Sequence, residues 1–584
     1  MTALAPERRS HRWLAPVAAL ALLAPAAATG RPKAAPAPAV DARAAGLRIY
    51  REGVLPSGKP LEGTAQRGIP RVGPDAACAA CHRRSGFGAS EGPIRIPSIA
   101  ASALFGWRES APAVPVAAPA PASVRTVPAN SAAEARAARM AARTARIAAQ
   151  RGPERRPPYD DASLARAIRE GVDVTGRPLA PGMPRYALRD EEMKSLVAYL
   201  RTLSADPAPG VSEEEIHLAT VLQPGVDPAK RRAMLEVMQA FVRDKNAGTR
   251  SEVQRREAGT EREYRAYRKW VLHVWDLTGP ADGWGAQLDA LYARDPVFAL
   301  MGGLGPGSWR PIHDWSERLG VPCLFPQSDL PAPSAGFYTV YLSRGISLEA
   351  EALAKYLLDR GERRPVVQVF RDDEESAAAA SAFRAAMRAG AGTPVDERRA
   401  EGPIPRTFWE RLATERPGAT LVLWLGAGDL AEAGALVEVG SAVEGVFLST
   451  TMLGDGPRGG LAAGGDARVR LVHPEDLPRS RGARLLKVKR WLHEKGIALS
   501  DERVQMNAYF AVAVTADVVT HMADLFSREF LVERVEHAVG NTVAPSIYPR
   551  VSLGPDQRFA SKGSYIVKVT GAGELEPVSG WITP

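Results

Sequence analysis

The sequence predicts a multidomain protein in which a small all-α domain precedes a two-lobed α/β region. The chain has 584 residues, which is too long for a single hydrophobic core. Helical periodicity flanks a cysteine motif near residue 80, and beyond residue 213 buried-type strand segments alternate with long helical segments. A short linker at residues 204–212, with two prolines and a glycine, separates the two regions.

The first 29 residues have the order of a secretory signal peptide. Three arginines precede an apolar run from Trp13 to Leu23, and three alanines follow it. This run is too short to span a bilayer, and no later stretch offers about 18 apolar residues. We therefore expect an exported, soluble periplasmic protein, with an uncleaved N-terminal anchor as the alternative. Residues 30–43 are rich in Ala and Pro and predict a linker.

The most specific motif is Cys-Ala-Ala-Cys-His at residues 78–82. With this spacing two thiols add to the vinyl groups of a haem and the next side chain gives an imidazole to the iron. Cys78 and Cys81 are therefore predicted to carry one covalent haem c, with His82 as an axial ligand. A redox dithiol or half of a zinc site is the alternative, but a zinc site needs a second ligand pair and only Cys323 remains.

Two helical segments are expected to pack together on either side of this motif. The first places Gly46 and Tyr50 one turn apart, so a neighbouring helix can approach closely over the glycine. The second, residues 189–201, begins with acidic side chains and places Leu196 and Tyr199 on one side.

Together with a Met-containing loop, these features resemble class I c-type cytochromes over residues 44–203. The resemblance implies transfer of single electrons, with Met183 in the loop of residues 175–186 as the second axial ligand. A thioether opposite His favours a raised reduction potential. Met193 on the last helix and Met140 in an insertion are weaker candidates, and a five-coordinate iron would instead suit a haem peroxidase.

An insertion at residues 108–157 separates His82 from Met183 in the sequence. It is rich in Ala, Pro and Arg and carries nine Arg against three Glu, which accounts for +6 of the formal net charge of +9. We interpret it as a solvated spacer with few large apolar residues, or as a basic segment that docks an acidic redox partner or an anionic membrane surface. Export argues against nucleic acid as a partner.

Residues 213–584 alternate between strand and helix, which predicts parallel sheets with helices on both faces in two lobes. The expected strands are 216–222, 297–301, 338–342, 366–370, 421–425 and 446–448, and the expected helices are 233–243, 309–319, 348–358 and 377–389.

The order of these segments, with the Gly-rich turn at 302–307 and the late helix from Asn507, resembles type I periplasmic binding proteins, the branched-chain amino acid receptors of ABC transporters. Such receptors close two lobes on a small solute. By position the resemblance assigns the pocket to Ser308, Ser328, Asp329, Glu349 and Thr451. Thr451 stands where an acidic residue is expected, so amino-acid binding itself is doubtful.

The sequence contains no catalytic set: its histidines are scattered singly, and the turn at 302–307 lacks the Lys-Ser/Thr of a nucleotide-binding loop. We therefore predict a non-enzymatic electron carrier fused to a solute-binding-like module, serving a periplasmic dehydrogenase or a terminal electron acceptor. A transport receptor with an accessory haem domain is the alternative, and a peroxidase is the second one. The short linker further predicts coupling between solute binding and redox state.

Overall fold

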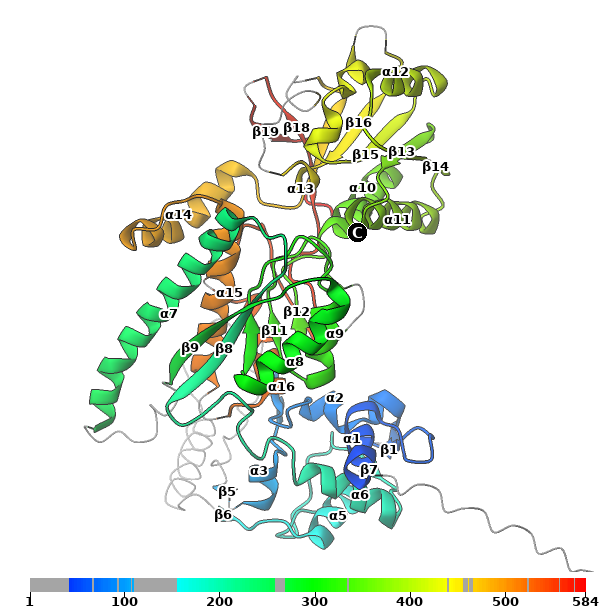
Figure 1. The fold of residues 1–584 in the computed structure, drawn as a ribbon. Helices are drawn as coiled ribbons and strands as arrows, with labels where there is room; N and C mark the ends of the chain where they lie inside the picture. The colour runs from blue at the N-terminus through cyan, green and yellow to red at the C-terminus, as the bar shows by residue number, and fades with distance from the viewer. Residues whose placement is uncertain are drawn as a thin grey trace, which may run out of the picture. The chain divides into compact units, whose positions relative to one another are not determined.

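The computed structural model describes residues 41–584 except 66–67, 92–93, 107, 110–154, 258–267, 333–335, 439–440, 455–460, 462–465, 523–524, 543, 556 and 572 (Figure 1). The predicted signal peptide, the first linker up to residue 40 and most of the predicted insertion lie outside the described residues. Within the described ranges, no helix combines the length and the apolarity that crossing a bilayer requires.

The first domain is built on two helices, α1 (Ala42–Glu52) and α6 (Asp190–Leu200). A Cβ atom at Gly46 would lie 2.0 Å from the carbonyl oxygen of Ser195, so only glycine allows this approach. One turn further along α1, the rings of Tyr50 and Tyr199 have centroids 5.2 Å apart. The predicted packing of these helices over Gly46 is confirmed.

Shorter elements complete this domain. Helix α5 begins at the N-cap Asp160, whose side chain accepts a hydrogen bond from the Ser163 amide, and ends at Gly171 in the left-handed region. The all-α prediction describes the core, to which the structure adds three small antiparallel sheets: β2-β1-β7, β3 (Ala89–Glu91) with β4 (Ile94–Ile96), and β5 (Arg108–Glu109) with β6 (Arg155–Arg156). The elements are α2 (Cys78–His82), α3 (Ala101–Phe105), α5 (Asp161–Glu170), β1 (Glu62–Thr64), β2 (Pro70–Val72) and β7 (Arg185–Tyr186).

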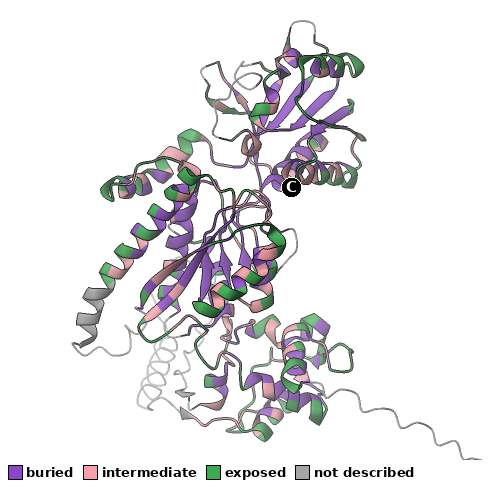
Figure 2. Cartoon of the chain, viewed as in Figure 1, coloured by how far each residue is buried: buried purple, intermediate pink, exposed green. Residues whose placement is uncertain are grey.

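The second region opens with lobe 1, whose five-stranded sheet has the order β12-β11-β10-β8-β9 and is parallel throughout. The inner strands β8, β10 and β11 are buried in the centre of the lobe (Figure 2), whereas the edge strand β9 is mostly half-buried. The strands are β8 (Glu215–Leu222), β9 (Lys269–Asp276), β10 (Ala299–Met301), β11 (Cys323–Leu324) and β12 (Thr339–Val340).

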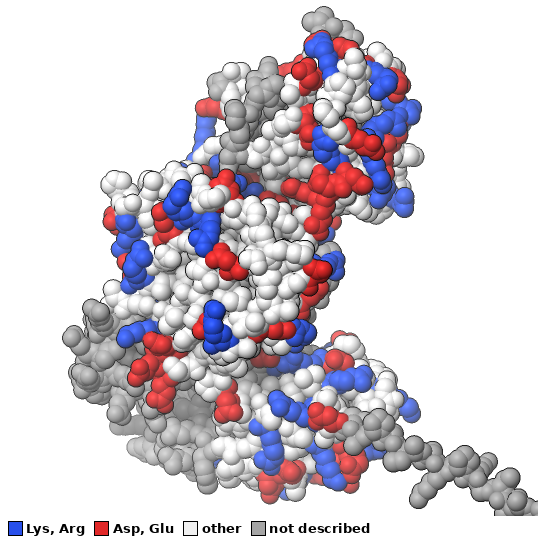
Figure 3. All heavy atoms as spheres, viewed as in Figure 1, with Lys and Arg blue, Asp and Glu red and all other residues white. Residues whose placement is uncertain are grey.

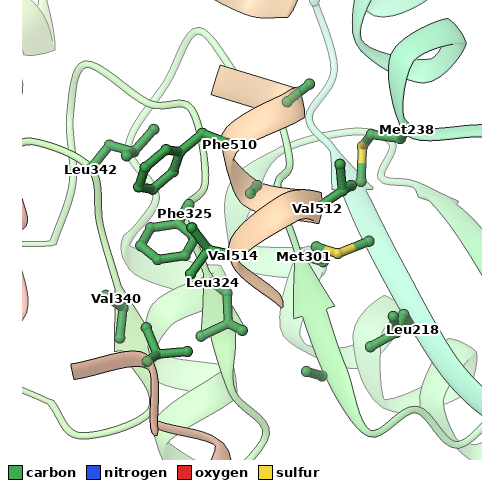
Figure 4. Close-up of a cluster of buried hydrophobic side chains, with 14 of the residues drawn as sticks. Leu218, Met238, Met301, Leu324, Phe325, Val340, Leu342, Phe510, Val512 and Val514 are labelled. Atoms are coloured by element: carbon green, nitrogen blue, oxygen red, sulfur yellow. The ribbon is translucent and has the colours of Figure 1, made fainter. Parts of the chain in front are cut away.

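Side chains of these strands point alternately to the two faces of the lobe 1 sheet, and each face has its own apolar cluster. Figure 4 shows the larger cluster, in which Phe510 of one helix packs edge-on against Phe325 with ring centroids 5.2 Å apart, and Val512 of the same helix lies on the side of Met238 and Met301. The opposite cluster is rich in tryptophan. Helices α7 (Pro228–Glu257), α14 (Pro478–Glu494), α15 (Glu502–His521) and α16 (Arg528–Val539) supply the first cluster, and α8 (Trp284–Arg294) and α9 (Arg310–Leu319) supply the second.

Lobe 2 has a seven-stranded sheet of order β14-β13-β15-β16-β17-β18-β19, in which the last two strands are antiparallel to their neighbours. Its two faces also carry separate apolar clusters. The elements are α10 (Ile346–Asp359), β13 (Val366–Phe370), α11 (Glu374–Ala389), β14 (Val395–Arg399), α12 (Arg406–Glu415), β15 (Thr420–Trp424), β16 (Gly445–Ser449), α13 (Thr450–Leu453), β17 (Val469–His473), β18 (Tyr565–Val569) and β19 (Leu575–Pro577).

The chain crosses between the two lobes in three places: from β12 to α10, from β17 to α14, and after α16 into β18. Two of these crossings run side by side, because the Ala560 and Ser561 amides donate to the carbonyls of Tyr341 and Leu342. The prediction of a two-lobed α/β region with parallel sheets is confirmed, and two of the crossings between its lobes are hydrogen-bonded to each other.

Candidate functional site

The cysteine motif forms one short helix, α2, in the first domain. Within it His82 is buried and only 5% exposed, Cys78 is half-buried and Cys81 is exposed. Neither cysteine is in a disulfide. Because residues three apart lie on the same side of a helix, the two thiols face the same direction.

The orientation of His82 suits a metal ligand. Its Nδ1 lies 2.9 Å from the carbonyl oxygen of Pro97, and a carbonyl only accepts, so Nδ1 carries the proton. This bond fixes the ring and leaves Nε2 as the basic nitrogen. Burial lowers the pKa of His82 and favours the neutral imidazole.

Met183 lies in a loop that is tied to the motif. Its amide donates to the Ala180 carbonyl at 3.0 Å, and the Arg185 guanidinium contacts the carbonyl oxygen of Met183. Tyr186, at the end of the loop, donates from its hydroxyl to the Ala76 carbonyl at 2.8 Å, two residues before Cys78. Met183 and Cys78 pack against the same apolar cluster. The loop and the motif therefore share one core.

The alternative methionines are placed differently. Met193 is 4% exposed and buried in α6 as a core residue, while Met140 lies outside the described residues. In the described part, no three His, Cys, Asp or Glu side chains gather as a metal site. Two thiols, an oriented imidazole and a thioether in one small domain fit a haem better than a zinc ion.

A second candidate site lies between the lobes of the binding-protein-like region. Two hollows, of about 410 and 950 Å³, are lined by residues of both lobes. Asp329 and Thr451 line both of them, and Ser328 lines the smaller one. Glu349 lies behind Thr451 and lines neither hollow, and neither does Ser308.

The predicted pocket residues bond mainly to other parts of the protein. Ser328 donates to the Gly307 carbonyl at 3.3 Å, and the carbonyl of Ser308 accepts from the Gln223 amide at 3.0 Å. Asp329 is paired with Arg503 at the start of α15. An amino-acid clamp would need these hydroxyls and this carboxylate to face a ligand.

Glu349 is fully buried in α10 and bonded to two hydroxyls. Ser449 donates to it at 2.7 Å, and the Thr451 hydroxyl contacts its other oxygen. Burial raises the pKa of Glu349 to about 8, so the carboxyl is neutral over much of the physiological range.

Sequence patterns did not identify several charged residues of the cleft. Glu375 lines the smaller hollow, and Arg503 and Lys230 line both. Burial raises the pKa of Glu375 to about 7. Arg503 and Glu375 each stand in the first turn of a helix that meets the cleft, but the sequence does not show which helix ends meet there. The cleft carries both signs of charge, and on the face shown in Figure 3 basic and acidic side chains are likewise interspersed.

Residues 71–204 match the cytochrome c family model. No curated protein matches the chain.

Among solved structures, a putative branched-chain amino acid ABC transporter protein from Rhodospirillum rubrum is 18% identical, with a TM-score of 0.45, over 62% of this chain and 100% of that one. A branched-chain amino acid ABC transporter protein from Thermus thermophilus, with bound valine, is 14% identical, with a TM-score of 0.47, over 64% and 98%. A leucine-binding protein from Thermotoga maritima is 15% identical, with a TM-score of 0.43, over 63% and 99%. The chain thus contains a cytochrome c domain followed by a two-lobed α/β region that is similar to ABC transporter substrate-binding proteins.

Proposed function

We propose that the protein is an exported mono-haem electron carrier whose binding-protein-like module links it to a periplasmic dehydrogenase system. The observation that carries this proposal is the fixed orientation of His82, which lies on the same helix as both cysteines. Its Nδ1 is hydrogen-bonded to the carbonyl oxygen of Pro97. The nearby Met183 loop, tied to Ala76 by Tyr186, supports a second axial ligand.

Each residue has a separate role in this proposal. Cys78 and Cys81 would hold the haem through thioether bonds, and His82 and Met183 would be the ligands of its iron. When bound, the haem supplies a one-electron couple. The Pro97 carbonyl keeps His82 oriented, and the apolar cluster around Tyr50 and Leu196 excludes water from the site.

The binding-protein-like module has a charged cleft that suits a small polar solute. Asp329 and Arg503 present opposite charges at its wall, with Glu375 and Lys230 close by. The family's amino-acid clamp is not reproduced by the residues around Ser328 and Thr451. We propose that the module binds a small solute outside the amino-acid class or docks the redox partner.

A conservative exchange at Met183 tests the axial ligand. Met183→Leu removes the sulfur but keeps the size of the side chain, so the weak thioether-to-iron absorption at the red end of the spectrum should vanish and carbon monoxide should bind the reduced protein. Met193→Leu, the matched control in the core of α6, should leave the spectrum unchanged. An unchanged spectrum in Met183→Leu would contradict the assignment.

Two other functions remain as alternatives. The cavity between the lobes favours a transport receptor with an accessory haem domain, in which solute binding would persist after both haem cysteines are replaced. A haem peroxidase would need an open iron position, so the unmutated protein would bind carbon monoxide and turn over peroxide. Calorimetry with a solute panel and the carbon monoxide spectrum distinguish these functions from an electron carrier.

A further inference from the structure

The smaller hollow between the lobes is lined by two polar side chains that have no hydrogen-bond partner among the described residues. Glu375 stands in the first turn of α11 in lobe 2, and Asn507 stands in α15 of lobe 1. Asn507 is only 4% exposed. An unsatisfied buried amide is costly, and the hollow of about 410 Å³ has room for a small molecule. The two side chains therefore point to a ligand that supplies the missing hydrogen bonds.

The basic groups that line this hollow already have acidic partners. Arg503 pairs with Asp329, and Lys230, which is 48% exposed, lies 3.9 Å from Asp501. A carboxylate on the ligand would have to compete with these partners for either cation. Glu375, by contrast, forms no ion pair within the described part of the chain, so the charge that this hollow leaves for a ligand is negative.

Glu375 also has an electrostatic environment that a cation would relieve. Burial raises the pKa of Glu375 to about 7, and the carboxylates of Asp329 and Asp373 add to the rise, whereas Arg503 opposes it. These three groups belong to the loop after β11, to the N-cap of α11 and to α15, respectively. A positive charge bound beside Glu375 compensates for the burial and offsets the repulsion from both neighbouring carboxylates. The hollow therefore favours a cation over an anion.

The remaining wall of the hollow sets the type of cation. Much of this wall is apolar and is formed by Val226, Leu304, Leu342, Met452 and Val504. Tyr548 is the only aromatic residue among the described residues that line the hollow, whereas a quaternary ammonium ion is usually held by several aromatic faces. A quaternary ion also has no N–H group to donate to a carboxylate. The wall therefore fits a primary ammonium group on a small apolar body.

We propose that the smaller hollow binds a small primary ammonium ion, whose N–H groups are held by Glu375 of lobe 2 and Asn507 of lobe 1. This inference rests on the solute-binding role proposed above for the module. The Glu375 carboxylate accepts one N–H group and neutralises the charge, and the side-chain oxygen of Asn507 accepts another. The apolar body of the ligand lies against the side chains of Leu304, Met452 and Val504.

Calorimetry on the intact protein with three probes of one shape tests the charge requirement. Cyclohexylamine carries an ammonium group, cyclohexanol is neutral and cyclohexanecarboxylate is an anion. Because the three probes share one rigid ring, the cost of ordering the ligand is nearly the same for each. The affinity for cyclohexylamine should exceed that for cyclohexanol by about tenfold, the low end for a hydrogen bond to a charged group. Cyclohexanecarboxylate should bind more weakly than both.

Two variants of α11 assign this preference to one side chain. Glu375→Gln keeps the size of the side chain and removes its charge, so the affinity for cyclohexylamine should fall about tenfold while that for cyclohexanol is retained. Glu374→Gln changes the neighbouring exposed residue, which lines neither hollow, and should retain the parent's affinity for every probe. In the parent at pH 7, binding of the amine should release protons, because the bound cation lowers the pKa of Glu375; heats measured in buffers of different ionisation enthalpy detect this release, which Glu375→Gln should lack.

Equal affinity of the parent for cyclohexylamine and cyclohexanol would overturn the proposal, as would undiminished affinity for the amine in Glu375→Gln. Tighter binding of the carboxylate would also overturn it, but would leave the solute-binding role of the module intact. If none of the three probes binds, the proposal fails, and a titration with amino acids then shows whether the solute-binding role fails with it. The electron-carrier function is judged separately, from the covalent haem of the same protein.

Discussion

Replacing Glu349 by glutamine should remove a large part of the pH dependence of stability. Burial raises the pKa of Glu349 from 4.5 to about 8, so the folded protein retains a proton that the unfolded chain releases. Its stabilising contribution is fully present below pH 4.5, is lost as pH rises toward 8, and is constant above that. The interval between the two pKa values corresponds to a loss of at most about 5 kcal/mol in the free energy of unfolding, at about 1.36 kcal/mol for each pH unit.

Glutamine resembles the protonated carboxyl and can still bond to Ser449 and Thr451. We therefore expect Glu349→Gln to gain stability relative to the parent as pH rises from 5 to 8, by about 3–5 kcal/mol. Urea titrations of the intact protein at four pH values measure this difference. Glu351 lies on the same helix as Glu349, and Glu351→Gln, which breaks its partly exposed ion pair with Arg344, should keep the parent's pH profile. The reasoning is refuted if Glu349→Gln also retains that profile.

Two further predictions concern the folding of single elements. Gly46→Ala should destabilise the first domain by about 1–3 kcal/mol in urea titration, because the new Cβ meets the Ser195 carbonyl. Gly285→Ala in α8 is the control: the space around Gly285 is open, so this variant should be neutral or stabilising. Asp373→Ala should cost about 1 kcal/mol by removing the N-cap that accepts from the Ser376 amide at 2.9 Å; thermal unfolding that matches the parent's would contradict this role.

Five interior strands, β8, β10, β13, β15 and β16, could be predicted from the sequence because their environment is uniform, whereas the interior strands β11, β17 and β18 were not predicted. Residues 366–370 form a fully buried strand, β13, with the predicted bounds, since a central parallel strand is apolar on both faces. The edge strands β9 and β14 were not predicted. Each has a neighbour on one side only, and the sequence of β14, Val-Asp-Glu-Arg-Arg, lacks the continuous apolar run that marks a central strand.

The candidate sites show the same distinction between local and long-range signals. The proposed roles of Cys78, Cys81 and His82 rest on five consecutive residues, so the motif is visible in the sequence. The Arg83–Glu536 pair joins residues 453 positions apart, and Arg503 meets Asp329 across 174 positions. A local sequence pattern does not predict such pairs, because they form only when elements far apart in the sequence pack together.

The central claim is that this chain carries a covalent haem on residues 78–82, and extraction of the denatured mature protein with acid and organic solvent tests it most directly. Thioether bonds survive this treatment, whereas a haem held only by coordination is released. We expect the haem absorbance to remain with the polypeptide, and to be lost from the double variant Cys78→Ala, Cys81→Ala. Intact haem in the organic phase from the unmutated protein would contradict the account.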